Sequence, residues 1–205
     1  MATWPSACTL ALMASASPEL FLKREGNNVV TSPIKGTQPL DEHGFGEKDQ
    51  SENIMIVDLM RNDLGQICRD GSVDVANLLR SEDHPGLRHL VSDVTGELRD
   101  GISWKEIITA LLPAGSISGA PKSSALQVIA ENEPVERGPY CGILGWVEGD
   151  KAELSVAIRT FWTLRDSQLH FGTGAGITWG SEPMAEWEET QLKARKLISV
   201  AGGNL

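Results

Sequence analysis

The residue with the clearest chemical potential is Lys35, which lies in the segment 31–37 (TSPIKGT). Pro33 fixes its own φ and keeps the residue before it extended, and Gly36 allows the backbone to approach another group closely. A lysine presented in this way provides either a charge for an anion or, if it is desolvated, an amine nucleophile. The alternative interpretation is a surface lysine beside a turn.

Three glutamates have the spacing or position of metal ligands. Glu186 and Glu189 are three residues apart in a predicted helix, and Lys193 follows one turn later, so the three side chains share a helix face. Two carboxylates one turn apart can bind Mg²⁺ together with water and substrate oxygens. Glu52 is expected in the first turn of another helix, where a carboxylate complements the dipole. The alternatives are a solvated acidic face with a Glu189–Lys193 ion pair, and a capping role for Glu52.

Two loops rich in small residues, 115–121 and 172–176, are candidates for anion binding. Each exposes backbone N–H groups, and Ser116 adds a hydroxyl donor to the first loop. Arg159 ends an apolar run that is predicted to be a strand, where an arginine usually has an anionic partner. His89 precedes another apolar strand and could act as a general acid or base near neutral pH. An internal salt bridge for Arg159 and a structural role for His89 are the alternatives.

The elements that must position these residues are hairpins mixed with helices. The patterns predict strands on both sides of a turn at 25–28, followed by a polar loop over 38–50. They also predict a strand over 89–98 and an antiparallel meander over 140–178, with turns at 149–150 and 166–167. They predict helices that start near Ser51, at the capping box Ser103–Glu106, at Pro121 and at Pro183. The mixture indicates an α+β fold of mainly antiparallel sheets with packed helices.

Helical periodicity also predicts which side chains are buried. On the helix near Ser51, one predicted face contains Ile54, Val57, Arg61 and Leu64, and its apolar coverage is widened by Met55, Leu59 and Met60. On the final helix, to about Val200, the predicted stripe contains Trp187, Ala194, Leu197 and Ile198.

Composition narrows the classes of function. The chain has 205 residues and a net charge of −10, which argues against nucleic-acid binding. Its three cysteines are an odd number and lie far apart in sequence, so neither a disulfide framework nor a metal site with cysteine ligands is expected, and a cytoplasmic setting is predicted. No apolar run approaches the length of a membrane span, and the mildly apolar segment 9–16 is interpreted as an ordinary strand.

Seven segments together resemble the C-terminal part of the chorismate-utilising enzymes, a family that includes anthranilate synthase component I, aminodeoxychorismate synthase component I, and the isochorismate and salicylate synthases. In the family's order they are 33–37 (PIKGT), 52–63 (ENIMIVDLMRND), 89–92 (HLVS), 115–122 (GSISGAPK), 156–160 (VAIRT), 174–177 (GAGI) and 186–194 (EWEETQLKA). The resemblance implies the family's fold, with a chorismate-binding domain over residues 15–205 and an atypical segment over residues 1–14.

The resemblance also implies a role for each matched position. Glu52 and Glu189 match the family's Mg²⁺ ligands, and Glu186 matches a carboxylate that supports the metal through water. His89 matches a histidine beside the reacting ring, a candidate for proton transfer. The positions that match groups holding or lining the substrate are Ser116, Tyr140, Arg159, Gly174, Ala175, Gly176 and Lys193.

Lys35 separates the members of this family. Anthranilate synthases carry alanine at this position, whereas many aminodeoxychorismate synthases carry a lysine that attacks C2 of chorismate as the 4-hydroxyl leaves, before ammonia enters at C4. The resemblance therefore implies an aminodeoxychorismate synthase component I, on the route to 4-aminobenzoate and folate, supplied with ammonia by a glutamine amidotransferase. The alternatives are an anthranilate synthase component I-like enzyme and an inactive chorismate-binding fragment.

The fragment alternative rests on length, because the family's synthase subunits are much longer than this chain. The expectation is that most of the N-terminal portion is missing. The isolated chain is then expected to be poorly stable, since some predicted strands would lack partners.

Overall fold

The computed structural model describes residues 12–41, 44–84, 87–164 and 168–204. These residues form two compact units. Unit 1 contains the described residues of 12–17, 136–140 and 157–204, and unit 2 contains those of 18–135 and 141–156.

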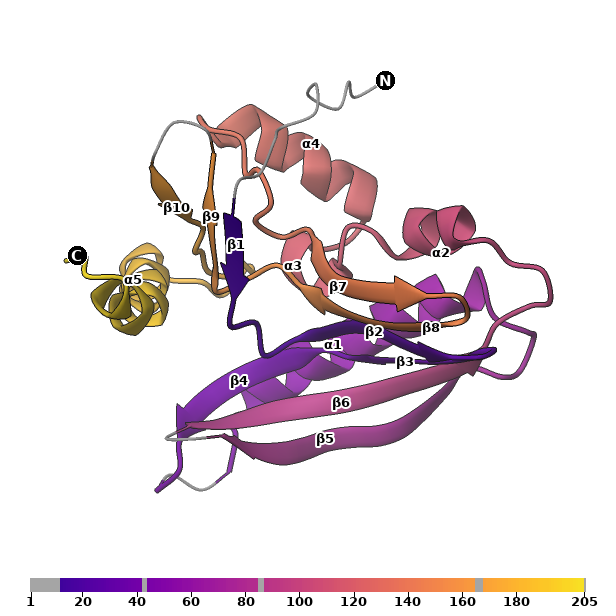
Figure 1. The fold of residues 1–205 in the computed structure, drawn as a ribbon. Helices are drawn as coiled ribbons and strands as arrows, with labels where there is room; N and C mark the ends of the chain where they lie inside the picture. The colour runs from indigo at the N-terminus through magenta and orange to yellow at the C-terminus, as the bar shows by residue number, and fades with distance from the viewer. Residues whose placement is uncertain (1–11, 42–43, 85–86, 165–167, 205) are drawn as a thin grey trace. The chain divides into compact units, whose positions relative to one another are not determined.

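Unit 2 is built on a seven-stranded antiparallel sheet (Figure 1). Its strands are β2 (Leu20–Glu25), β3 (Asn28–Ser32), β4 (Ile34–Pro39), β5 (Asp74–His84), β6 (Leu87–Glu97), β7 (Ile143–Glu148) and β8 (Lys151–Val156). β5 pairs along one edge of β6, while β3 and β4 follow one another along the other edge and are separated by Pro33. β2 pairs with β3 and β8, and β7 pairs with β8.

Local turn signals set the hairpins of this sheet. The predicted turn between β2 and β3 is confirmed, with Gly26 at φ +64°, a conformation that glycine adopts without a steric penalty. The β7–β8 hairpin is also confirmed, with its turn at 149–150. β5 was not predicted, and the polar loop is shorter than expected because β4 extends to Pro39.

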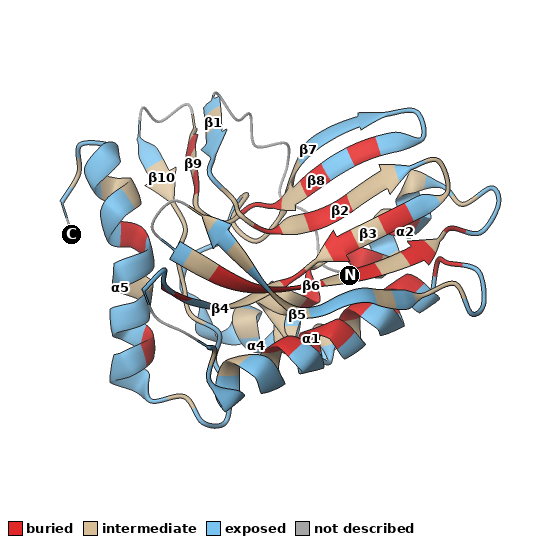
Figure 2. Ribbon diagram, turned by 90° about the horizontal axis from the view of Figure 1, so that it is seen from below, coloured by how far each residue is buried: buried red, intermediate tan, exposed pale blue. Residues whose placement is uncertain are grey.

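Helix α1 (Glu47–Gly65) packs across one face of the sheet, against β4, β5 and β6 (Figure 2). It begins one turn before the predicted start near Ser51. The predicted apolar face is partly wrong, because Ile54 and Met55 are 42% and 56% exposed whereas Asn53 is fully buried. The buried positions are Asn53, Ile56, Val57, Met60, Asp63 and Leu64.

Three shorter helices complete unit 2. They are α2 (Trp104–Leu111), α3 (Gly115–Ser118) and α4 (Lys122–Asn132). The predicted capping box of α2 is present, since the Ser103 hydroxyl accepts from the Glu106 N–H and the Glu106 carboxylate accepts from the Ser103 N–H. Pro121 occupies the N-cap of α4 instead of its first turn.

Unit 1 contains a small antiparallel sheet and the final helix. The sheet has the order β1 (Leu12–Ser15), β9 (Thr160–Thr163), β10 (Leu169–Phe171), and the helix is α5 (Pro183–Val200). The single meander predicted over 140–178 is therefore wrong, because β7–β8 and β9–β10 belong to different sheets. A bend at 157–159, with Arg159 at φ +50°, ends the run that was predicted to be one strand. The predicted turn at 166–167 lies outside the described residues.

The extent of α5 is confirmed, but its predicted stripe is wrong in part. Trp187 is 56% exposed, and Glu186 and Ala194 are the buried residues of this helix. Both units combine antiparallel sheet with helix, which confirms the α+β class. Over the described residues, no helix is both long and apolar enough to cross a membrane.

Candidate functional site

The predicted site residues fall in both units. Unit 2 holds Lys35, Glu52, His89 and Ser116. Unit 1 holds Tyr140, Arg159, Gly174, Ala175, Gly176, Glu186, Glu189 and Lys193.

Lys35 is half-buried on β4, and the close approach expected at the next residue is present. Gly36 has φ +79°, and a Cβ atom there would lie 2.9 Å from Phe45 Cδ1 and 3.1 Å from Asp49 Cβ. Over the residues that the structure describes, the Lys35 ammonium makes no hydrogen bond or ion pair. A half-buried amine of this kind is suited either to bind an anion or to act as a nucleophile.

His89 lies on β6, directly beside β4, and is only 2% exposed. Its Nδ1 atom is 2.9 Å from the Thr37 hydroxyl, and Thr37 is its register partner on β4. The imidazole of His84, on β5, meets the His89 ring edge-on, with 5.1 Å between the ring centroids. The ring of His89 is therefore held from both neighbouring strands.

Glu52 lies in the second turn of α1, because the helix starts at Glu47, so the capping role is not supported. Its carboxylate is 4.0 Å from Lys48 Nζ. The next residue, Asn53, fixes this part of α1 to the sheet: its amide donates to the Leu90 carbonyl (3.3 Å) and accepts from the Ser92 hydroxyl (2.5 Å).

Ser116 lies in α3, so the predicted loop 115–121 is helical over its first four residues. The segment is fixed to the rest of unit 2 through buried polar contacts. The Ser116 hydroxyl donates to the Glu19 carboxylate (2.5 Å), which is 4% exposed. Lys122, at the end of the same motif, lies 2.6 Å from Asp63 Oδ2 and also donates to the Ala110 and Leu111 carbonyls. Burial raises the pKa of the Asp63 carboxyl, although the hydrogen bond and charge of Lys122 act in the opposite direction.

In unit 1 the structure brings Tyr140 onto the glycine-rich loop 172–176. A Cβ atom at Gly172 would lie 2.4 Å from Tyr140 Cγ, and one at Gly174 would lie 3.0 Å from the Tyr140 hydroxyl. The Arg137 guanidinium stands over the same ring, 5.7 Å from its centroid. Two of the predicted substrate-binding elements are therefore neighbours, and glycine is required where they touch.

The same loop is joined to α5, since the Thr173 hydroxyl donates to the Thr190 carbonyl (3.4 Å). On this helix the Glu186 carboxylate is 8% exposed and accepts from the Ser181 hydroxyl (2.6 Å). Glu189 and Lys193 form the predicted i,i+4 ion pair, at 2.6 Å.

The carboxylates of α5 suit a hard divalent cation in their chemistry, since Mg²⁺ prefers carboxylate oxygens. Glu186 and Glu189 supply two of them one turn apart. Within its described residues, neither unit gathers three or more His, Cys, Asp or Glu side chains in an arrangement that could hold a metal ion.

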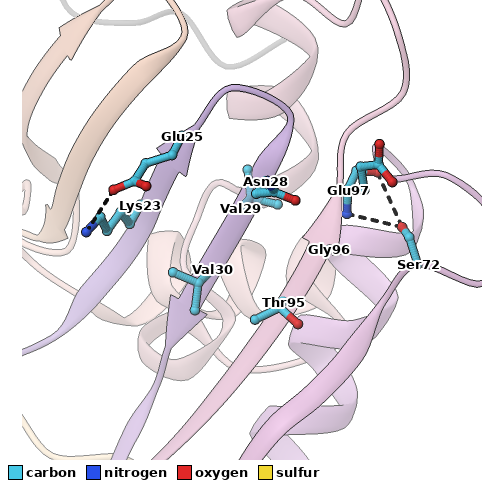
Figure 3. A pocket seen from close by; sticks show the side chains of 9 residues that line it. All are labelled: Lys23, Glu25, Asn28, Val29, Val30, Ser72, Thr95, Gly96 and Glu97. Atoms are coloured by element: carbon cyan, nitrogen blue, oxygen red, sulfur yellow. Dashed lines mark hydrogen bonds and ion pairs between the residues drawn. The ribbon is translucent and has the colours of Figure 1, made fainter.

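A groove of about 540 Å³ lies elsewhere on unit 2 (Figure 3). It is open along β2, β3 and β6, and its polar lining includes Lys23, Glu25, Ser72, Thr95 and Glu97. None of the predicted site residues lines it, so this groove is not assigned to the candidate site.

Comparison with known proteins identifies the family. Residues 7–199 match the family described as chorismate binding enzyme. The chain belongs to this family. It is 40% identical over 199 residues to anthranilate synthase component 1 from Haloarcula marismortui, covering 91% of this chain and 40% of that protein. It is 38% identical over 201 residues to anthranilate synthase component 1 from Neisseria meningitidis serogroup B, covering 92% of this chain and 41% of that protein.

The fold agrees with this membership. The crystal structure of anthranilate synthase component I from Streptococcus pneumoniae matches with a TM-score of 0.81 and 34% identity, covering 90% of this chain and 43% of that one. The chain spans about two fifths of the length of the curated relatives it matches.

Sequence reasoning missed the residues that support the predicted ones. Thr37 and His84 contact His89, and Asn53 anchors the helix segment next to Glu52. Thr37 falls inside the matched segment 33–37, which is the only signal that pointed to it. Nothing in the local sequence shows that Asn53 is buried, because its partners lie on β6.

Proposed function

We propose that this chain is the chorismate-binding part of an enzyme that aminates chorismate to anthranilate. The proposal is carried by one observation: proteins named anthranilate synthase component 1 are about 40% identical to it over nine tenths of the chain. We further propose that the chorismate-binding domain occupies residues 15–205 and that ammonia is delivered by a glutamine amidotransferase.

In this proposal Glu52, Glu186 and Glu189 would hold Mg²⁺, which would supply positive charge for the ring carboxylate of chorismate. Arg159, Lys193 and the backbone of the loop 174–176 bind the substrate carboxylates, while Ser116 and Tyr140 line the pocket. The contact of Tyr140 with Gly172 and Gly174 supports a shared role for the ring and the loop. His89 transfers a proton at the leaving hydroxyl, and its fixed ring supports that role.

Lys35 favours a second candidate, aminodeoxychorismate synthesis. Its amine is half-buried and unpaired over the described residues, as a nucleophile should be. The lysine nitrogen would bond to C2 of chorismate while the ring double bond shifts and the C4–O bond breaks. Ammonia would then bond to C4 and the C2–nitrogen bond would break, which releases Lys35 and gives 4-amino-4-deoxychorismate.

One experiment separates these candidates. The purified chain is incubated with chorismate, ammonium and MgCl₂, and products are identified by fluorescence and mass spectrometry. We expect fluorescent anthranilate that appears directly and is formed equally by Lys35→Ala. A product that becomes 4-aminobenzoate only after a lyase is added, with a mass adduct on Lys35 and loss of turnover in Lys35→Ala, would replace the first candidate by the second.

Lys105→Ala is a matched control, because Lys105 is an exposed lysine of α2 in the same unit. It is expected to leave product identity and rate unchanged. If neither product forms, while calorimetry shows chorismate binding that depends on MgCl₂, the chain is a chorismate-binding fragment without turnover.

A further inference from the structure

A line of charged side chains on β5 leads to His89. Arg80, Glu82 and His84 alternate along the strand, so they project from the same face of the sheet. The register places Glu82 directly opposite His89 on β6. Side chains directly opposite each other in an antiparallel pair are close enough to interact, so Glu82 and His84 both border the proposed proton-transfer residue.

The contacts along this line are continuous. Arg80 is held on one side by Asp93, with Nε 2.8 Å from Oδ2 and a second contact of 3.2 Å to Oδ1, and on the other side it pairs with Glu82. The other oxygen of Glu82 is 2.9 Å from His84 Nε2. The His84 ring then meets the His89 ring at 61°, with its centroid 5.1 Å away.

Neighbouring groups on this line favour the ionised forms of its carboxylates. The hydrogen bond and charge of Arg80, helped by His84 and opposed by burial, lower the pKa of the Glu82 carboxyl. Hydrogen bonds from Arg80, Ser32 and Asn77 outweigh burial and lower the pKa of the Asp93 carboxyl. Glu82 is therefore an anion at neutral pH and can hold the His84 imidazole in place.

We propose that Glu82 and His84 are positioning residues for His89, which they fix against Thr37 so that proton transfer takes place at Nε2 of His89. This inference rests on the proposed role of His89 in the amination of chorismate. The Thr37 hydroxyl faces Nδ1 from β4, and His84 faces the ring from β5. In this proposal Nδ1–H donates to the Thr37 hydroxyl, so the neutral His89 ring carries its proton on Nδ1 and Nε2 is the atom that takes up a proton. The imidazolium then gives the Nε2 proton to the leaving hydroxyl and returns to the same neutral tautomer.

The test reads the tautomer of His89 directly. The full chain is labelled with ¹⁵N-histidine, and two-bond ¹H–¹⁵N spectra are recorded for the wild type, His84→Ala, Glu82→Gln and His84→Phe. We expect one neutral tautomer, protonated at Nδ1, in the wild type and a mixture of tautomers in His84→Ala and Glu82→Gln. His84→Phe keeps a ring of similar shape and is expected to restore most of the single tautomer.

His170→Ala is the matched control, because His170 stacks on Trp162 in unit 1 and has no part in this line. His84 is about one third exposed, so its replacement is compatible with folding. If His89 keeps the wild-type tautomer in both His84→Ala and Glu82→Gln, or if the neutral wild-type ring is protonated at Nε2, the inference is wrong.

Turnover is measured separately, so that failure of the inference and failure of the proposed function can be distinguished. In active protein, His84→Ala should lower kcat about tenfold with KM unchanged within about twofold, since only the reacting geometry is affected. An unchanged kcat together with a changed tautomer would show that His89 is positioned but does not transfer the proton, and so would overturn the assignment of Nε2.

Discussion

The two units hold their candidate site residues in different ways. In unit 2 the polar side chains near the candidate residues are buried and bonded to strands: His89, Asn53 and Ser92 are each at most 2% exposed. In unit 1, α5 buries only Glu186 and Ala194, and Glu189 and Lys193 are 50% and 38% exposed. Buried polar groups are costly to disturb, whereas exposed ion pairs contribute little to stability. The comparison indicates that unit 2 holds polar side chains in fixed positions, whereas unit 1 exposes charged side chains to solvent.

The largest expected effect comes from the anchor of α1. Asn53→Ala removes two buried hydrogen bonds and leaves the Ser92 hydroxyl and the Leu90 carbonyl without that partner. We expect the free energy of unfolding to fall by about 3 kcal/mol, measured by urea denaturation. Ile54→Ala, at an exposed position of the same helix, should cost less than about 1 kcal/mol. If Asn53→Ala and Ile54→Ala lose the same free energy of unfolding, the stated difference between the two units has no basis.

The next effect concerns the contact of the glycine loop with Tyr140 in unit 1. A methyl group at Gly172 would overlap the Tyr140 ring, so Gly172→Ala should displace the ring and cost about 2 kcal/mol. Tyr140 is the only tyrosine of the chain, so its NMR resonances report the displacement without ambiguity. Gly180→Ala, where an added Cβ meets no atom within 4 Å, should leave these resonances in place.

A smaller effect, which depends on pH, is expected at Asp93 in unit 2. Burial would raise the pKa of this carboxyl, but hydrogen bonds from Arg80, Ser32 and Asn77 hold it below the ordinary value of 3.8. Ionised Asp93 therefore stabilises the folded state above pH 3.8, and this contribution is lost as the pH falls through the lower, folded-state pKa.

Asp93→Asn should accordingly cost about 1.5 kcal/mol at pH 7, and the gap to the wild type should narrow in acid below pH 3.8. Guanidinium denaturation at several pH values provides the measurement. The control is Asp58→Asn, since Asp58 is exposed and paired only with Arg61 at 3.1 Å in the described contacts. A gap for Asp93→Asn that widens in acid would contradict the assignment.

The smallest effect on stability is expected on α5. Glu189→Gln breaks an exposed ion pair, so the free energy of unfolding should change by no more than about 0.5 kcal/mol. If Glu189 is a metal ligand as proposed, the same variant should weaken the binding of chorismate in the presence of MgCl₂, measured by calorimetry. A large loss of stability would show that unit 1 resembles unit 2 in how it uses its charges.

Elements with strong local signals were predictable from the sequence. The turn at Gly26, the capping box of α2 and the length of α5 each depend on residues close together in the chain, and all three are present. The β5 strand was missed because its residues do not alternate between buried and exposed. It pairs with β6 along its length, with Arg80 bonded to Asp93 across the pair, and it bulges near Leu79, which has φ +54°.

The candidate site shows the same limit of sequence-based prediction, which is that local periodicity does not show partners from other parts of the fold. Periodicity assigned Ile54 and Met55 to the buried face of α1, whereas the amide of Asn53 is buried instead because Leu90 and Ser92 satisfy it. On α5 the indole of Trp187 was expected to be buried, but the buried position is Glu186, which is bonded to Ser181. In both helices a polar side chain took the interior position because a partner distant in sequence or in a loop met its hydrogen-bonding needs.

The position of β2 has a consequence for how the protein comes to be folded. β2 lies between β3, the next strand along the chain, and β8, which is synthesised only after most of the chain. Pairing between segments that are distant in sequence has an entropic cost of loop closure, which arises before the new contacts stabilise the structure. We therefore expect the β2–β3 hairpin to form early and the docking of β7–β8 to be the slow, late step. Until it occurs, a nascent chain carries an open strand edge that can pair with other chains, so its yield in the cell should respond to chaperones.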